Sequence, residues 1–211
     1  MAQQSNSPAP VSSHDRILAA AKRLFATRGY ESTSTVAIAR LAGTSESQLT
    51  KHFGSKEGLL EAIFERGWQA MSGRLHALQG VPEPVARLRS TMELIVQALD
   101  NDPEMRELML LEGRRVRREG NAVLMTAGYL QLVSFIDQTV AELKAAGQLR
   151  AELHPQAIRS ALIGMFEGLM RDHLLAERAG YPASFTRREF TAIFDAAISA
   201  FVVAQRGESS T

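Results

Sequence analysis

Seven polar side chains lie close together between residues 45 and 52, around one apolar residue, Leu49. They are Ser45, Glu46, Ser47, Gln48, Thr50, Lys51 and His52. Such side chains suit contacts with nucleic acid: glutamine can bond adenine through two atoms, lysine reaches guanine or phosphate, and serine or threonine serves phosphate oxygens. A glutamate could accept from cytosine or simply stabilise the start of a helix. The expected chemistry is recognition of DNA, although a short polar helix alone is more often solvated surface.

Two nearby segments offer sites for an anion. Ser55 can cap a helix whose first turn contains Lys56, and Thr33, Ser34 and Thr35 stand at the start of another helix. The free N–H groups at a helix N-terminus favour an anion. A lysine there is unfavourable beside the positive end of the helix dipole, unless a bound anion offsets the repulsion. We therefore expect DNA phosphates at both positions.

The elements that carry these residues match the helix-turn-helix plan, in which a second short helix enters the major groove. The motif covers about residues 34–53, with the turn "AGTS" in the middle. We expect Ala39 and Leu41 to fasten its first helix to the core. Leu49 and Phe53, four residues apart, should fasten its second. Residues 12–60 carry 7 basic and 4 acidic side chains, against 17 and 19 in residues 61–211, so the positive excess lies around the motif.

Residues 16–64 resemble the DNA-binding domain of TetR-type transcriptional regulators. The matching residues are Ile17, Ala20, Ala21, Phe25, Gly29, Tyr30, Thr33, Ile38, Ala39, Ala42, Gly43, Ser45, Leu49, Phe53, Lys56 and Leu60. The resemblance implies nine or ten helices, a C-terminal domain that binds a small ligand, and a homodimer formed mainly by the last two helices. It also implies release of operator DNA when the ligand binds. The chain departs from the family pattern at Thr50, where tyrosine is common, and at Val36-Ala37, where a polar pair is frequent.

The remainder of the chain is also helical in period, so the predicted class is all-α, with about nine helices. We expect an uncharged, disordered arm at residues 1–11, a helix-turn-helix DNA-binding domain at 12–60, and a ligand-binding and dimerisation domain at 61–211. No apolar run is long enough to span a membrane. The lack of cysteine excludes disulfides and suits the cytoplasm, where we expect the protein to act. The histidines and carboxylates show no convincing metal spacing, and we expect no cofactor.

Two sets of residues in the second domain are candidates for other roles. Small and aromatic residues on the last two helices could form a four-helix dimer interface, although packing within one chain is the alternative. They are Ala161, Gly164, Gly168, Phe190, Phe194, Ala197 and Phe201. An adaptable apolar pocket could be lined by methionines and aromatic residues, with a glutamate and a histidine to orient a polar group, although such residues more often form core. They are Trp68, Met71, Met92, Met105, Met109, Met125, Tyr129, Phe135, Met165, Phe166, Glu167, Met170 and His173.

Three functions fit these features. The leading interpretation is a homodimeric repressor that a small, largely apolar effector releases from a palindromic operator. An alternative is a DNA-binding dimer whose second domain only dimerises or binds a partner protein and takes no small molecule, which the lack of a cavity of a few hundred Å³ would favour. An all-α enzyme is the third, but the chain contains no P-loop, G-x-S-x-G, HExxH or CxxC motif, so we expect no enzymatic activity.

Overall fold

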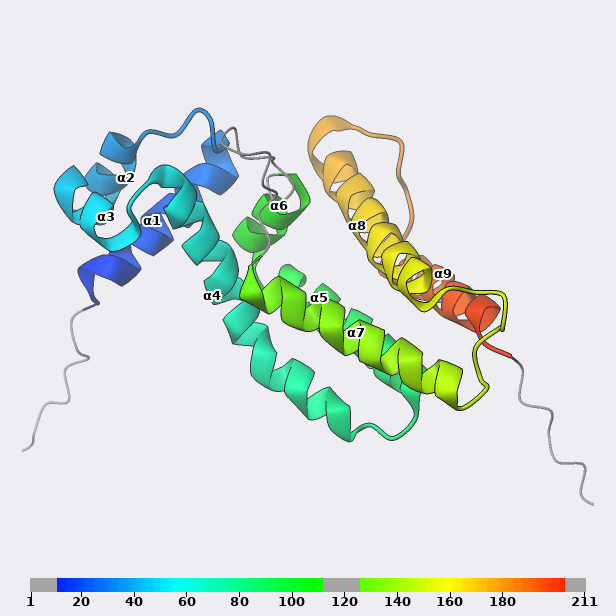
Figure 1. Ribbon diagram of the computed structural model, residues 1–211. Helices are drawn as coiled ribbons and strands as arrows, with labels where there is room; N and C mark the ends of the chain where they lie inside the picture. Colours follow the sequence, from blue (N-terminus) through cyan, green and yellow to red (C-terminus); the bar gives the residue numbers. More distant parts are fainter. Residues whose placement is uncertain (1–10, 112–125, 204–211) are drawn as a thin grey trace, which may run out of the picture. The chain divides into compact units, whose positions relative to one another are not determined.

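The computed structural model of the protein is built from helices, and it describes residues 11–111 and 126–203 (Figure 1). The described α-helices, with one short 3-10 helix, η1, at Leu78–Gly80, confirm the predicted all-α class. They are α1 (Ser13–Arg28), α2 (Thr35–Ala42), α3 (Glu46–Phe53), α4 (Lys56–Ala77), α5 (Pro84–Asp100), α6 (Pro103–Leu111), α7 (Ala127–Ala145), α8 (Pro155–Ala179) and α9 (Arg187–Phe201). The predicted arm at residues 1–10 and the ligand candidate Met125 lie outside the described residues.

The chain divides into two compact units, Met1–Phe64 and Glu65–Thr211. Helix α4 begins in the first unit and continues into the second. Each unit has its own core, and the two cores are described separately below.

Serine hydroxyls cap the N-termini of α1, α2 and α3 in the first unit. Ser12, Ser34 and Ser45 each accept a hydrogen bond from the N–H group three residues further along, which satisfies one of the free donors of a helix start. These caps explain why the helices begin where they do.

The core of the first unit lies between one face of α1 and the inner faces of α2 and α3. Ile17 and Phe25 of α1 are almost fully buried, as are Ile38 of α2 and Leu49 of α3. Leu41 does not hold α2 to this core, contrary to expectation, because its side chain is 48% exposed. Ile38, Ala39 and Ala42 form the buried face of α2 instead.

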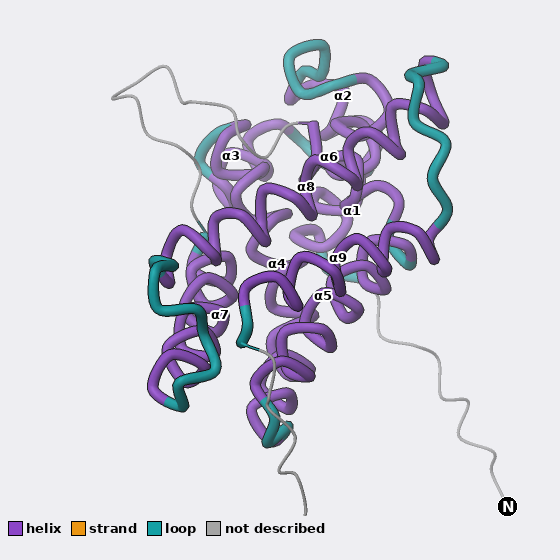
Figure 2. The backbone as a smooth tube through the Cα atoms, turned by 90° about the vertical axis from the view of Figure 1, so that its right-hand side faces the viewer, coloured by secondary structure: helices purple, strands orange, loops and turns teal. Residues whose placement is uncertain are grey.

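The second unit packs α5, α7, α8 and α9 around a shared apolar core (Figure 2). A buried arginine, Arg87 of α5, donates to the Val81 carbonyl oxygen and, at 2.6 Å, to the Glu142 carboxylate of α7. After α9, the chain forms a single β-bridge between Val202 and Leu149, which lies between α7 and α8. These contacts tie the first, middle and last parts of the unit together.

Within residues 11–111 and 126–203, no helix has the length and apolarity needed to span a membrane. The same residues contain no group of three or more metal-binding side chains.

Candidate nucleic-acid interface

Helix α3 exposes a polar surface while one apolar side chain fastens it. Leu49 is completely buried and Phe53 is half-buried, with its ring centroid 4.7 Å from that of His14 on α1. The seven polar residues predicted to face DNA, Ser45 at the cap and the other six in the helix, are all exposed. The structure therefore brings the predicted set together on one short helix.

Several of these side chains are held by residues outside α3. The Thr35 hydroxyl, at the start of α2, donates to Oε1 of Glu46. The Thr44 hydroxyl, in the turn, donates to Oε1 of Gln48 at 2.6 Å. His52 Nε2 lies 3.1 Å from the Ser13 hydroxyl of α1. Thr35 was predicted as a phosphate contact, whereas Ser13 and Thr44 were not predicted to contribute at all.

Two further members of the set are occupied within their own helix. The Thr50 hydroxyl donates to the Glu46 carbonyl oxygen at 3.1 Å, and Ser47 shares a hydrogen bond with Ser45. Lys51 differs from them, since its exposed ammonium group has no hydrogen bond or ion pair within the described part of the chain. Lys51 is therefore a positive charge on α3 that is available to a nucleic acid.

Thr33 was predicted to contact phosphate, and the structure contradicts this. Its side chain is only 2% exposed, and its hydroxyl donates to the carbonyl oxygens of Gly29 and Leu24. Its backbone N–H donates to the Tyr30 carbonyl oxygen. Thr33 thus closes the loop between α1 and α2, and Ser34 and Thr35 remain the candidates at the start of α2.

Lys56 was also predicted to hold a phosphate, but its charge is compensated within the chain. Its ammonium group donates to the carbonyl oxygens of Tyr30, at 3.0 Å, and Thr33, at 3.2 Å. It also lies 4.2 Å from the centroid of the Tyr30 ring, a cation–π distance. A lysine in the first turn of α4 is therefore explained by loop carbonyls rather than by DNA.

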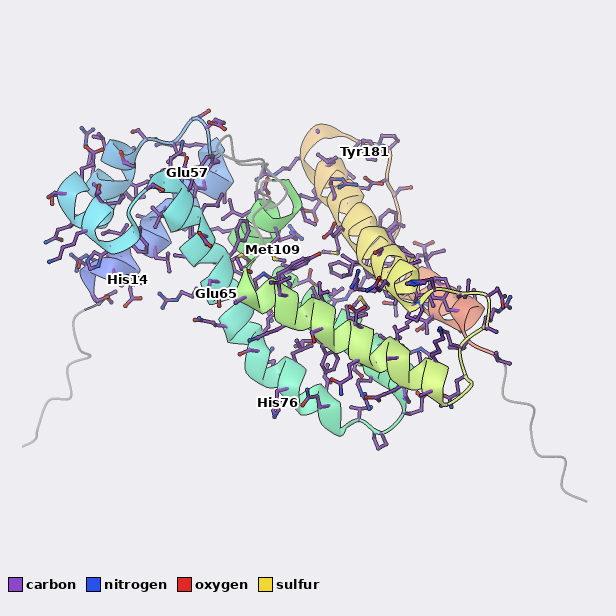
Figure 3. The ribbon with its side chains drawn as sticks, viewed as in Figure 1. His14, Glu57, Glu65, His76, Met109 and Tyr181 are labelled. Atoms are coloured by element: carbon purple, nitrogen blue, oxygen red, sulfur yellow. The ribbon has the colours of Figure 1, made fainter. Side chains whose placement is uncertain are left out.

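The start of α4 also has its own anion, Glu57, which Figure 3 labels. The pKa of the Glu57 carboxyl lies below its usual value, chiefly because the carboxylate accepts a hydrogen bond from its own backbone N–H. Burial opposes this effect, whereas the hydroxyls of Ser55 and Tyr30 and the charge of Lys56 add to it. Because folding lowers the pKa of Glu57, the ionised carboxylate stabilises the folded state. This contribution to stability is present above the usual pKa of a glutamate and is lost as the pH falls through the lowered value.

The close approach of the first turn of α4 to the end of α3 requires a glycine at position 58. A Cβ atom there would lie 2.2 Å from the Phe53 carbonyl oxygen, which is backbone and cannot rotate away. Gly58 therefore allows α4 to begin directly beside the end of α3, which explains the second glycine of "GSKEG".

Replacing Lys56 by methionine should destabilise the first unit by about 1–2 kcal/mol, because two carbonyl oxygens lose a charged donor. Chemical denaturation would measure the loss. Lys51→Met is the matched control, and it should leave the free energy of unfolding unchanged because Lys51 is exposed and has no partner in the described chain. A Lys56→Met protein of normal stability whose DNA binding responds less steeply to salt would instead indicate a phosphate contact.

Within the described part of the chain, the predicted ligand residues are spread over two small pockets and the core. Trp68 and Met71 border a pocket of about 10 Å³ between α4, α5 and α7, and Met92 borders one of about 40 Å³ between α5 and α9. The other described candidates line neither pocket. Met105, Phe135, Phe166 and Met170 are buried core residues, whereas Met109, Tyr129, Met165, Glu167 and His173 are half-buried. Both pockets are far smaller than the ~300–1,000 Å³ of typical ligand sites.

The predicted dimer residues separate into two groups. Phe190 and Phe194 are buried and pack against Phe166 of the same chain, with ring centroids 5.8 and 6.5 Å away, so they are core residues rather than interface residues. Ala161 and Gly164 are exposed, and Gly168, Ala197 and Phe201 are half-exposed. On α9 the large apolar side chain that is exposed is Ile193.

In the first three-helix unit, the second and third helices form a helix-turn-helix, and a larger helical unit follows. This arrangement defines a class of DNA-binding transcriptional regulators. Residues 17–63 match the family model of the bacterial regulatory proteins of the tetR family. The chain is 32% identical to the HTH-type transcriptional repressor AcnR of Corynebacterium efficiens over 128 residues, which cover 54% of this chain and 68% of AcnR. The protein belongs to the TetR family of transcriptional regulators.

One further relative and two solved structures of similar fold match most of the chain. The chain is 25% identical to the HTH-type transcriptional regulator UidR of Escherichia coli K12 over 173 residues, which cover 82% of this chain and 86% of UidR. FadR of Bacillus subtilis, solved in complex with stearoyl-CoA, has a similar fold, with a TM-score of 0.73 and 16% identity over 88% of this chain and 96% of FadR. AibR, solved with isovaleryl coenzyme A and operator DNA, has a TM-score of 0.66 and 23% identity over 90% of this chain and 98% of AibR.

Proposed function

We propose that this protein is a homodimeric repressor that binds a palindromic operator through α3. The observation that carries the proposal is that Leu49 and Phe53 fasten a short helix whose other side chains are polar and exposed, in the second position of a helix-turn-helix. No other side chain of α3 packs into the core of the first unit.

The side chains of α3 divide into those suited to bases and those suited to phosphates. Gln48 and Glu46 carry directional groups that suit base edges, and Lys51 can reach guanine or phosphate. Ser47 and His52 suit the phosphate backbone of DNA, whereas the Thr50 hydroxyl already donates to the Glu46 carbonyl oxygen. At the start of α2, Ser34 caps the helix and Thr35 lies beside it, where the first N–H groups favour a phosphate.

Substituting Lys51 or Gln48 by alanine should each weaken operator binding by roughly 1–3 kcal/mol. Neither change removes a buried contact, because both side chains are exposed, so the folded state should be unaffected. Fluorescence anisotropy with operator DNA would measure the loss. Lys144→Ala, an exposed lysine of α7, is the control for charge alone. Unchanged operator affinity in both α3 variants would reject the assignment of α3 as the recognition helix.

Thr50 offers a test of how closely α3 approaches DNA. In the free protein its hydroxyl points back to the Glu46 carbonyl oxygen, so it has no donor left for a phosphate. Thr50→Tyr should extend a hydroxyl outward and tighten DNA binding by about 0.5–1.5 kcal/mol. Thr50→Phe is the matched control, because it adds the ring without the hydroxyl. Weaker binding of both variants would mean that the helix docks too closely for a ring at this position.

The exposed faces of α8 and α9 support the homodimer. The two helices lie side by side within the second unit (Figure 1, Figure 2). Along α8, Ala161 and Gly164 leave a face with little side chain, and a Cβ atom at Gly164 would meet nothing within 4 Å. On α9, Ile193 is 53% exposed. Two copies packed on these faces would hold two recognition helices for half-sites about one DNA turn, ~34 Å, apart.

We include in the proposal a small, largely apolar effector that releases the operator. The fold neighbours FadR and AibR were each solved with an acyl-coenzyme A, which supports an effector with an acyl chain. The ~40 and ~10 Å³ pockets would have to open to admit one. Trp68, Met71 and Met92 would then be the first side chains to move. Titrating stearoyl-CoA into the protein–operator complex tests this, and release of DNA is the expected result.

The second candidate is a dimeric regulator without a small-molecule effector. The small volumes of the same two pockets favour it. Operator binding and thermal stability that stay constant across a screen of acyl-coenzyme A and free acyl compounds would support this candidate over the first.

A further inference from the structure

We propose that Thr35 and Thr44, which lie outside α3, determine the base preference of the recognition helix by fixing the orientation of Glu46 and Gln48. This inference rests on the proposed function of α3. Both threonines donate a hydrogen bond to the side chain they position, and neither needs to touch DNA itself.

Thr44 is well placed to hold Gln48. Its backbone N–H donates to the Ala39 carbonyl oxygen at 3.0 Å, which fixes the residue within the turn. Its hydroxyl donates to Gln48 Oε1 at 2.6 Å, so the amide oxygen faces the turn. An amide has one carbonyl oxygen and one NH₂ group, so holding the oxygen in the turn leaves the NH₂ group to face outward.

This orientation changes the base that Gln48 selects. A glutamine that bonds adenine through two atoms needs its Oε1 to accept from the adenine amino group. Guanine presents two acceptors, N7 and O6, in the major groove, which suit an NH₂ group that is turned outward. Gln48 held by Thr44 should therefore prefer guanine, and Gln48 without that restraint should regain a preference for adenine.

Thr35 acts in the same way on Glu46. Its hydroxyl, in the first turn of α2, donates to one carboxylate oxygen of Glu46, in the first turn of α3. The other oxygen remains free to accept from the amino group of cytosine. A glutamate already held in one orientation loses less side-chain freedom on binding. Removing the restraint should therefore reduce discrimination for cytosine by roughly 2- to 10-fold.

Selection of bound DNA from a random pool, followed by affinity measurements on single-base variants of the selected site, tests both threonines. Thr44→Val should shift the preference at the Gln48 position from guanine toward adenine. Thr35→Val should flatten the preference for cytosine at the Glu46 position. Thr44→Ser retains a hydroxyl and should keep the wild-type preference. Thr27→Val removes an exposed hydroxyl on α1 that donates to the Arg23 carbonyl oxygen, and it should change no preference.

The outcomes separate this inference from the proposed function. If Gln48→Ala and Glu46→Ala alter base preference but both threonine variants keep it, the positioning role is refuted and α3 remains the recognition helix. Lower affinity for all sequences alike in the threonine variants refutes the role as well, because it indicates a lost phosphate contact or a structural effect rather than a change in base readout. If the alanine variants also leave base preference unchanged, the assignment of α3 itself is wrong.

Discussion

A Gly164→Glu protein should remain folded but sediment as a monomer and bind the palindromic operator roughly 100-fold more weakly or worse. A Cβ atom at this exposed position on α8 meets no neighbour in the chain, so one subunit accepts the change. In a twofold dimer, the substitution would instead place two carboxylates on a face that is otherwise built for close approach. Loss of the second recognition helix removes the avidity of two linked half-sites, which is worth ~10²–10⁴ in affinity.

Gly73→Glu is the matched control for this experiment. Gly73 is likewise an exposed helical glycine, on α4, with nothing within 4 Å of an added Cβ atom. It lies outside the proposed interface, so the variant should remain a dimer and bind the operator normally. Analytical ultracentrifugation at matched protein concentrations would compare the two. A Gly164→Glu protein that stays dimeric would show that another surface joins the subunits.

Gly128→Ala should cost the second unit about 2 kcal/mol of stability and lower its Tm by roughly 4–8 °C. Glycine-to-alanine changes within helices usually stabilise, but here the new methyl group would lie 2.1 Å from Trp68 Cβ and 3.5 Å from its Cα. These atoms cannot rotate away, so the backbones of α4 and α7 would have to separate. The Glu65 carboxylate, which accepts from the Gly128 N–H at 3.3 Å, would be displaced with them.

Gly73→Ala, on the same helix as Trp68, should stabilise the protein rather than destabilise it. Its Cβ atom meets open space, so this variant should gain about 0.5–1 kcal/mol from a less flexible unfolded chain. Guanidinium denaturation of both variants would show whether the free energy of unfolding rises or falls in each. Equal stability of Gly128→Ala and the unchanged protein would mean that α4 and α7 do not approach this closely.

The helices of the first unit could be predicted from sequence because their determinants are local. Ser34 and Ser45 cap the helices they precede, and Leu49 has the spacing of a buried position. The roles of Thr33 and Lys56 could not be predicted in this way. Lys56 bonds carbonyl oxygens 26 and 23 residues away, and only the folded loop between α1 and α2 brings them within reach.

The second unit shows a different limit of sequence patterns. Phe190 and Phe194, four residues apart, share a face of α9, but spacing alone does not say whether that face meets the same chain or a partner. Phe166 of α8 covers them, which leaves Ile193 exposed. Apolar residues occur on both sides of α9, so only tertiary packing decides between them.

The central claim is that a dimer of this chain recognises a specific DNA sequence through α3, and selection from random duplex DNA tests it most directly. The expected result is an enriched inverted repeat whose half-sites lie about one helical turn apart. The Gln48→Ala/Lys51→Ala double variant should bind this repeat no better than unrelated DNA. A pool without any enriched sequence, or a repeat that the double variant binds as tightly as the unchanged protein, would contradict the claim.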